Sequence, residues 1–466
     1  MKTFSVAFFI LFVALLLTCY HRTEHFDDAW FAEQSYWLVR DGWVRSELFR
    51  GLNGWEDRIY VFHKLFIYAG ALVMKLFGFS LPASKLLTTF CALIAGYLIW
   101  VYNQRASKKQ QLLALILYFG CGAIIRYFSI NRPEIMCMLF GLGSYLALDR
   151  PNNKPSNVLL AGCLAGLAAL THLNGIIYLV AGAGWLLVKT NWRAVIWFSL
   201  FGGLTLSIYG LDALADNQFN AMLDQFVNDP ATQSNFKLID KLYVMLNYHQ
   251  LFFHSHGEVP LSVLVLLCVL IFRRALSLSQ SVPLYLTLLI VAFWLLTKSN
   301  FDFYYILFVP WFVLLASQCL TVYLPDSPVW QQRAGTGVLI IYYGFALFSI
   351  GKVLEENYTT RYVPAYNNTL AQHMPDRQTK VIAPISFFFG QIENYRIHGL
   401  SYYSAKHETA SLEEFFRLAA QENAKYVVSD GYKTASYVIP LDVPDRIGTY
   451  QLIFRDDMTS IYERQP

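Results

Sequence analysis

Two adjacent carboxylates, Asp27 and Asp28, follow a first apolar run that covers residues 3–20. Aromatic residues stand directly behind them, beginning with Trp30 and Phe31. A carboxylate held where an apolar segment meets water suits a general base that takes a proton from a hydroxyl group. A structural alternative is that either aspartate only caps the helix that follows. The residues by themselves leave open which of the two would act.

Charged and aromatic residues near the ends of later apolar runs form a second group. Lys and Arg at such positions suit a phosphate group anchored in a membrane, so the two groups together describe transfer from a lipid phosphate to an incoming hydroxyl. The candidates are Lys64, Lys85, Arg132, Glu134, His172, Lys298, Tyr304 and Tyr305. Each also has a structural interpretation. The lysines can extend toward lipid headgroups, and Arg132 and Glu134 can form an ion pair at the membrane boundary. Tyr304 and Tyr305 can belong to the aromatic belt at the membrane interface.

Metal ligands and disulfides are not indicated. His254, His256 and Glu258 have a spacing that metal ligands use, but no fourth partner is nearby. We therefore predict no metal site at these residues, although the paired aspartates have the oxygen donors to hold a divalent ion. The seven cysteines all fall inside or at the edge of apolar runs, which predicts neither a disulfide framework nor a cysteine zinc site.

The composition is that of a membrane protein. Of 466 residues, 56% are hydrophobic and 15% charged, with a mean hydropathy of +0.38, which excludes a soluble globular protein. Apolar runs of about 17–25 residues, long enough to cross a bilayer, recur before the polar tail. The net charge of +4 is explained by cytoplasmic loops and does not indicate nucleic-acid binding.

We predict a polytopic α-helical protein with about eleven transmembrane helices and additional interfacial helices. The spans are expected at residues 3–20, 82–102, 110–128, 134–149, 157–172, 174–188, 193–210, 259–272, 281–297, 303–323 and 335–351. The apolar segment 65–77 is short for a span, and the positive-inside rule places it on the outer surface. With that placement, the loops assigned to the cytoplasm contain Arg105, Lys108, Lys109, Arg150, Lys154, Lys189, Arg193, Arg273, Arg274 and Arg333.

This topology puts the N-terminus in the cytoplasm and the acidic pair outside a plasma (inner) membrane. The segment behind the pair is predicted to be a helix lying flat in the interface, ended by Gly42. Its apolar stripe contains Trp30, Phe31, Trp37 and Leu38, and the residues off the stripe, on its polar side, are Asp28, Glu33 and Arg40.

The polar tail predicts a small extracytoplasmic α/β domain over residues 352–466. Strands are expected at 379–386 and 425–429, a helix at 411–424 with Ser411 as N-cap, and a terminal strand pair within 450–464. Residues 1–351 would form a transmembrane domain, with a first extracytoplasmic loop at 21–81.

The order of these features resembles the polytopic C-type (GT-C) glycosyltransferases that use polyprenyl- or dolichyl-phosphate sugars. Protein O-mannosyltransferases and lipid A aminoarabinose transferases are examples. The family's acidic motif after the first span resembles Asp-Asp-Ala-Trp-Phe-Ala-Glu at residues 27–33. Its later motifs resemble residues 63–78, 131–134, 166–175 and 303–310. Two family prolines are absent from 63–78, and His172 stands where the family has lysine.

The resemblance implies that a monosaccharide passes from polyprenyl phosphate to an acceptor hydroxyl, with Asp27 as general base and Asp28 assisting. A single displacement of this kind inverts the anomeric centre. The implied partners are the lipid-linked donor and an acceptor glycan, lipid or protein, and the resemblance implies no obligatory metal or other cofactor. Two other classes stay open: a transporter or flippase of lipid-linked sugars, which would need polar residues at mid-membrane or a repeat, and a non-catalytic membrane assembly protein.

Overall fold

The computed structural model describes residues 2–150, 154–228, 238–297, 299–400, 402–403, 411–429 and 444–466. The chain divides into two compact units, which are described separately. The first contains Met1–His21, His63–Phe66 and Leu86–Asn357, and the second contains Arg22–Phe62, Ile67–Lys85 and Tyr358–Pro466. The segments Arg22–Phe62 and Tyr358–Pro466 thus pack in one unit although they are far apart in the chain. The functional boundary at 351/352 stays a prediction.

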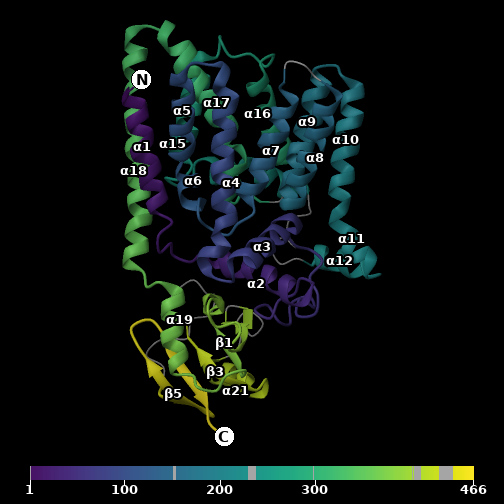
Figure 1. The fold of residues 1–466 in the computed structure, drawn as a ribbon, viewed down its shortest axis with the longest axis vertical. Helices are drawn as coiled ribbons and strands as arrows, with labels where there is room; N and C mark the ends of the chain where they lie inside the picture. Colours follow the sequence, from purple (N-terminus) through teal and green to yellow (C-terminus); the bar gives the residue numbers. More distant parts are fainter. Residues whose placement is uncertain are drawn as a thin grey trace. The chain divides into compact units, whose positions relative to one another are not determined.

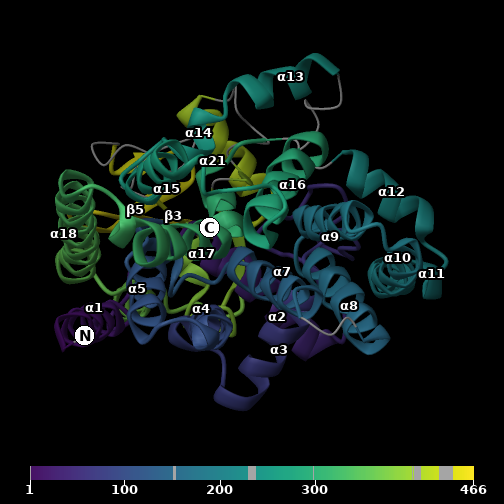
Figure 2. The same cartoon turned by 90° about the horizontal axis from the view of Figure 1, so that it is seen from above.

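The first unit is helical. Its long helices run roughly in one direction, seen lengthwise in Figure 1 and end-on in Figure 2. Its helices are α1 (Lys2–Leu17), most of α4 (Leu81–Tyr102), α5 (Lys108–Phe119), α6 (Gly122–Tyr127), α7 (Glu134–Leu148), α8 (Pro155–Thr171), α9 (Ile176–Val188), α10 (Trp192–Ser207), α11 (Leu211–Ala215), α12 (Phe219–Val227), α13 (Leu238–Leu246), α14 (His249–Phe252), α15 (Val259–Phe272), α16 (Ser281–Leu296), α17 (Val309–Gln318) and nearly all of α18 (Val329–Thr359).

Helix positions in this unit follow the apolar runs. Within the described residues, four helical stretches are long and apolar enough to cross a membrane: Leu81–Tyr102, Trp192–Ala215, Asp302–Asp326 and Val329–Gln372. Shorter apolar helices occupy the other expected positions, except that the run 110–128 is divided between α5 and α6. The helical class is confirmed, whereas the number of about eleven spans stays a prediction.

Small residues let two helices of this unit approach closely. A Cβ atom added at Gly162 on α8 would lie 2.4 Å from the carbonyl oxygen of Phe198 on α10. One turn later, a Cβ at Gly166 would lie 2.6 Å from the Gly202 oxygen. Any larger residue at either position would therefore push α8 and α10 apart, which is the usual reason for glycine in packed apolar helices.

The second unit contains helices and one mixed sheet. Its helices are α2 (Phe26–Asp41), most of α3 (Lys64–Phe77), α19 (Val363–Gln372) and α21 (Leu412–Gln421). Its strands are β1 (Lys380–Ala383), β2 (Arg396–Gly399), β3 (Ala424–Val428), β4 (Arg446–Ile447), β5 (Tyr450–Arg455) and β6 (Ser460–Arg464). The order is β2-β1-β3-β6-β5-β4, parallel among β2, β1 and β3 and antiparallel thereafter.

The expected elements of the tail are present, with α19, β2 and β4 in addition. The Ser411 hydroxyl accepts a hydrogen bond from the Glu414 N–H and so begins α21, as predicted. The amphipathic α21 buries Phe415 and Phe416 against the sheet residues Tyr450 and Tyr462. These aromatic side chains form the core of the C-terminal segment.

The environment of α2 corrects one expectation. The helix does end at Gly42, whose φ of 84° favours glycine. Its supposed polar side is not solvated, however, because Asp28 and Glu33 are fully buried. The loop that follows α2 folds back and supplies hydrogen-bond donors to Glu33, a contact that helical periodicity does not reveal. On α3, by contrast, Tyr68 and Leu72 are exposed on one side, as expected of a surface helix.

Candidate active site

The first turn of α2 holds the acidic pair in two different environments. His25 is the N-cap, and its backbone N–H donates to Asp28 Oδ2 at 2.7 Å. The Lys85 ammonium lies 3.1 Å from the same carboxylate oxygen. It also donates to the carbonyl oxygens of Arg22 and Thr23, at 3.2 and 2.7 Å. Asp28 is therefore a neutralised, buried anchor for the start of the helix.

Asp27 is oriented differently. Its side chain is 18% exposed, whereas that of Asp28 is 0% exposed. One Asp27 carboxylate oxygen lies 3.2 Å from His25 Nδ1, and the Asp27 N–H donates to that nitrogen at 3.3 Å. Of the two aspartates, Asp27 is the one that an incoming hydroxyl can approach.

Glu33 is a buried carboxylate that the sequence did not select. Its Oε1 accepts hydrogen bonds from Trp37 Nε1 at 3.0 Å and from the N–H groups of Glu47 and Leu48 at 2.7 and 3.1 Å. Its Oε2 accepts from the Ser46 hydroxyl at 2.5 Å. Burial raises the pKa of Glu33 to about 7, although these hydrogen bonds oppose the shift. The acidic motif at residues 27–33 contains Glu33, but its burial could not be predicted because three of its four donors, Ser46, Glu47 and Leu48, come from the loop after α2.

A second ionic cluster lies in the first unit, at the start of α7. The Arg132 guanidinium donates to both oxygens of Glu134, from Nε at 3.1 Å and from Nη2 at 2.8 Å. The Arg132 Cζ lies 3.7 Å from the centre of the Phe303 ring. Both charged side chains are buried, so the pair and the ring hold the guanidinium in one orientation.

Two imidazoles adjoin this pair. The rings of His63 and His172 stack with their centres 4.6 Å apart, and His172 Nε2 lies 3.8 Å from Glu134 Oε1. Burial is the main cause that lowers the pKa of His63 well below its ordinary value, assisted by the nearby positive charge of Arg132. His63 is thus neutral at physiological pH. His63 lies in the motif at residues 63–78 but was not among the predicted site residues.

The remaining predicted residues are distributed differently. The Tyr304 ring meets His172 edge-on with centres 5.5 Å apart, but Tyr305 is in the helical core, where its hydroxyl accepts a 3.0 Å hydrogen bond from Ser262. Lys64 is buried and forms an ion pair with Asp212, a partner 148 positions away in the chain that was not predicted. Lys298 lies outside the described residues.

Among the residues that the structure describes, no group of three or more His, Cys, Asp or Glu side chains is placed to hold a metal ion. The proposed independence from metal ions stays a prediction, because the chemistry of the acidic pair allows a divalent ion.

Comparisons with known proteins bear on the class of this site. Residues 65–210 match the family described as dolichyl-phosphate-mannose-protein mannosyltransferase. No curated protein matches the chain. The structure of ArnT from Cupriavidus metallidurans bound to undecaprenyl phosphate is similar with a TM-score of 0.68, at 12% identity over 99% of this chain and 98% of that one.

Two further structures are similar. The apo state of the same ArnT gives a TM-score of 0.66 at 11% identity, with the same coverage of both chains. The archaeal oligosaccharyltransferase AglB from Archaeoglobus fulgidus, in complex with an inhibitory peptide and a dolichol-phosphate, gives 0.55 at 11% identity over 91% of this chain and 69% of that one.

These findings confirm the resemblance to GT-C glycosyltransferases that the sequence indicated. The enzyme class, a glycosyltransferase, is likewise confirmed. At identities of 11–12%, the solved structures establish the fold and not the substrates. The roles of the individual residues therefore depend on the geometry described above.

Proposed function

We propose that this protein is an integral membrane glycosyltransferase that transfers a monosaccharide from polyprenyl phosphate to a hydroxyl of a glycan, lipid or protein acceptor. Support comes from the matched family, from the apolar helices, and from the buried cationic cluster that suits a lipid phosphate. The reaction would take place on the extracytoplasmic face, because the cytoplasmic loops collect the Lys and Arg residues.

The difference between the two aspartates supports Asp27 as general base. A base must be within reach of the hydroxyl that it deprotonates, and the Asp27 side chain is 18% exposed. Asp28 is fully buried and bound by Lys85, so its part in the reaction is to hold the first turn of α2. The geometry gives Lys85 this structural role, and its contact with a lipid phosphate stays a prediction.

The donor phosphate is assigned to the cluster of Arg132, His63 and His172, with Glu134 orienting the guanidinium. Arg132 supplies positive charge, and neutral imidazoles supply N–H donors, to the phosphate oxygens as the bond to the sugar breaks. Because polyprenyl phosphate is a good leaving group, no strong acid is needed. Attack by the activated hydroxyl in one displacement inverts the anomeric centre.

The topology belongs to the same proposal. About eleven helices cross a plasma (inner) membrane, with the N-terminus in the cytoplasm. Residues 1–351 form the catalytic membrane domain, and residues 352–466 lie on the extracytoplasmic side. Accessibility of single introduced cysteines to a membrane-impermeant reagent tests this placement, and labelling of the C-terminal segment only after the membrane is opened would contradict it.

Transfer by the purified protein tests the function. Asp27→Asn should keep the fold and donor binding but reduce transfer by about 100-fold or more, because the amide cannot accept the proton. Asp57→Asn, the same change at an exposed aspartate of the same unit, is the matched control and should transfer normally. Near-normal transfer by Asp27→Asn would remove Asp27 from the role of base.

Metal dependence has its own test. A chelator should leave the transfer rate unchanged, because the proposed charge stabilisation comes from protein cations. Loss of activity with the chelator and recovery with Mg²⁺ or Mn²⁺ would show that a divalent ion takes part.

A further inference from the structure

A cavity of about 1180 Å³ lies within the second unit, away from the first turn of α2. One wall comes from the C-terminal half of α2 and the loop behind it, and the other comes from β1, β2 and their neighbours. Small-molecule pockets are typically about 300–1,000 Å³, so this cavity has room for a ligand larger than one sugar.

The two walls are fixed to each other. The Gly399 N–H donates to the carbonyl oxygen of Leu48 at 2.9 Å, which joins β2 to the loop. The Phe388 ring also packs against the rings of Tyr36 and Phe79, with centres 6.0 and 4.9 Å apart. A main-chain hydrogen bond and an aromatic cluster therefore hold the cavity in shape before any ligand arrives, which lowers the cost of binding.

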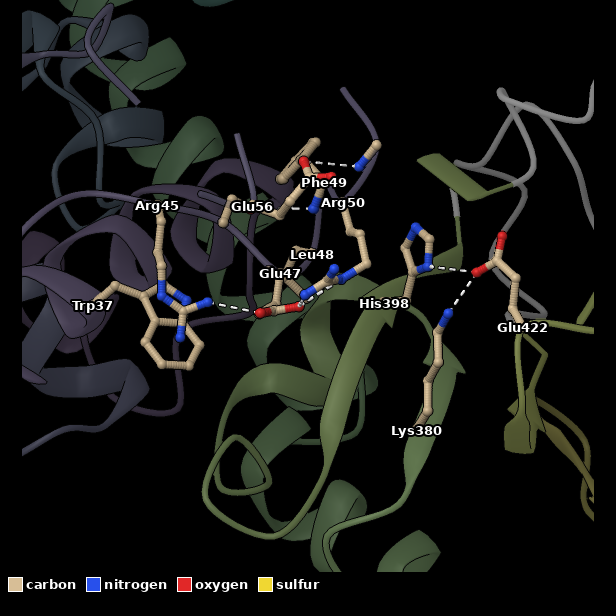
Figure 3. Close-up of polar contacts among 12 residues, drawn as sticks. Trp37, Arg45, Glu47, Leu48, Phe49, Arg50, Glu56, Lys380, His398 and Glu422 are labelled. Carbon is tan, nitrogen blue, oxygen red and sulfur yellow. Dashed lines mark hydrogen bonds and ion pairs between the residues drawn. The ribbon is translucent and has the colours of Figure 1, made fainter. Parts of the chain in front are cut away.

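The polar lining is held in place by shared carboxylates. Figure 3 shows the Arg45 guanidinium over the Trp37 ring, with its Cζ 3.5 Å from the ring centre. Glu47 lies between Arg45 and Arg50, at 2.7 and 2.6 Å. On the other wall, in the same figure, Lys380 binds Glu422. These groups are ordered by ion pairs, so little side-chain freedom is left to lose.

The lining carries an excess of positive charge. Five cationic side chains, Arg40, Arg45, Arg50, Lys380 and Arg396, face three carboxylates, Glu47, Glu393 and Glu422. Glu47 and Glu422 are engaged by the ordered cations, and Arg40 lies 4.0 Å from Asp41, a carboxylate that Arg45 binds at 2.7 Å. The excess therefore falls mainly on the exposed Arg396 and Arg40. Arg396 stands on the edge strand β2, and among the described residues it has no ion-pair partner.

This combination suits an acidic carbohydrate. Guanidinium groups bind phosphate or carboxylate oxygens in a fork, and the interleaved carboxylate and amide side chains can bind sugar hydroxyls. The aromatic rings Tyr36, Trp37 and Tyr395 give the same cavity apolar surface. We propose that this cavity binds the acidic sugar portion of the acceptor, with Arg40 and Arg396 holding its phosphate or carboxylate. The identification of the ligand as an acceptor rests on the proposed function.

Binding to the full-length protein in detergent tests the cavity directly. The probe is glucose 6-phosphate, with glucose and inorganic phosphate as separate arms, followed by ligand-observed NMR. Glucose 6-phosphate should bind the wild type, and both glucose and inorganic phosphate should bind at least about tenfold more weakly. The double variant Arg40→Gln/Arg396→Gln should lose at least about tenfold of the affinity for glucose 6-phosphate.

The matched control is Arg446→Gln, an exposed arginine on β4 at the opposite edge of the sheet, which should bind as the wild type does. Equal binding by wild type and the double variant, or none by the wild type, would overturn the proposal. Inorganic phosphate binding as tightly as glucose 6-phosphate would overturn the assignment to a sugar.

Failure of this inference can be told from failure of the proposed function. Asp27→Asn leaves the cavity untouched and should bind glucose 6-phosphate normally, whatever its transfer rate. Normal transfer by Asp27→Asn would refute the role of Asp27 without bearing on the cavity. Absence of glucose 6-phosphate binding to the wild type, together with loss of transfer by Asp27→Asn, would refute the cavity as a binding site and leave the proposed function intact.

Discussion

Two buried ion pairs invite comparison: Asp28 with Lys85 in the second unit, and Arg132 with Glu134 in the first. In both pairs the cation and the carboxylate are buried away from water, and the two partners lie about 3 Å apart. The first pair is completed by the carbonyl oxygens of Arg22 and Thr23. The second is bordered instead by imidazole and aromatic rings.

The surroundings of the two pairs indicate which one suits a ligand. Lys85 has three ammonium protons, and its contacts with Asp28 and two carbonyl groups use that number, so the pair acts as a fixed support. The Arg132 guanidinium has five N–H donors and is presented beside neutral imidazoles, an arrangement that suits an incoming anion. Burial alone does not separate the two pairs; the chemistry of their surroundings does.

Breaking the first pair should have the largest effect. Lys85→Met leaves the Asp28 carboxylate buried without its cation, which should cost about 3–5 kcal/mol of the free energy of unfolding. The measurement is unfolding in mixed micelles with increasing SDS. Lys75→Met, at an exposed lysine of α3, is the control, and Asp28→Asn added to Lys85→Met should restore part of the loss. A stable but inactive Lys85→Met would show that the lysine acts on substrate instead.

Glu33 differs from both pairs, because it is a buried carboxylate whose hydrogen bonds come from neutral donors. Its pKa is about 7 in the folded protein against 4.5 as the reference for the unfolded chain. Between these values the folded state binds more protons, so the stability contributed by Glu33 falls as the pH rises from about 4.5 to about 7. The full loss is about 3 kcal/mol.

Glu33→Gln should therefore flatten this pH dependence. The unfolding free energy of the variant relative to the wild type should rise by up to about 3 kcal/mol between pH 5 and pH 8, measured in the same SDS titration. Glu413→Gln, at an exposed position of α21, should follow the wild type. Parallel curves for wild type and Glu33→Gln would mean that Glu33 is ionised throughout this range.

The second pair should respond in catalysis more than in stability. Arg132→Lys keeps the positive charge but loses the two-point contact with Glu134, so a phosphate would be held less well. Transfer should fall by about 100-fold, in line with loss of one oriented charge donor, while the unfolding free energy changes by about 1 kcal/mol. The comparison fails if Arg132→Lys unfolds as readily as Lys85→Met.

The two pairs also show what the sequence could and could not predict. Arg132 and Glu134 are two positions apart, so their pairing was visible in the chain. Asp28 meets Lys85 only after the loop between them has folded, and Lys64 meets Asp212 in the same way. The length of the apolar runs predicted the long helices, and Ser411 predicted the start of α21. The two-residue strand β4 is too short to produce a pattern, and β2 (Arg-Ile-His-Gly) has one large apolar residue, whereas the equally short β1 has Val-Ile-Ala.

Substitution in the exposed ion pair of Lys352 and Glu355 should have the smallest effect on the unfolding free energy. Lys352 Nζ lies 2.8 Å from Glu355 Oε2 on α18, as close as the partners in the second buried pair, but both side chains are more than half exposed. Solvent screening and side-chain entropy cancel most of the attraction, so Lys352→Ala should change the unfolding free energy by at most about 0.5 kcal/mol. The SDS titration used for Lys85→Met also measures the unfolding free energy of Lys352→Ala. If Lys352→Ala lowered the unfolding free energy as much as Lys85→Met, the distance between the partners, and not their desolvation, would determine the strength of these ion pairs.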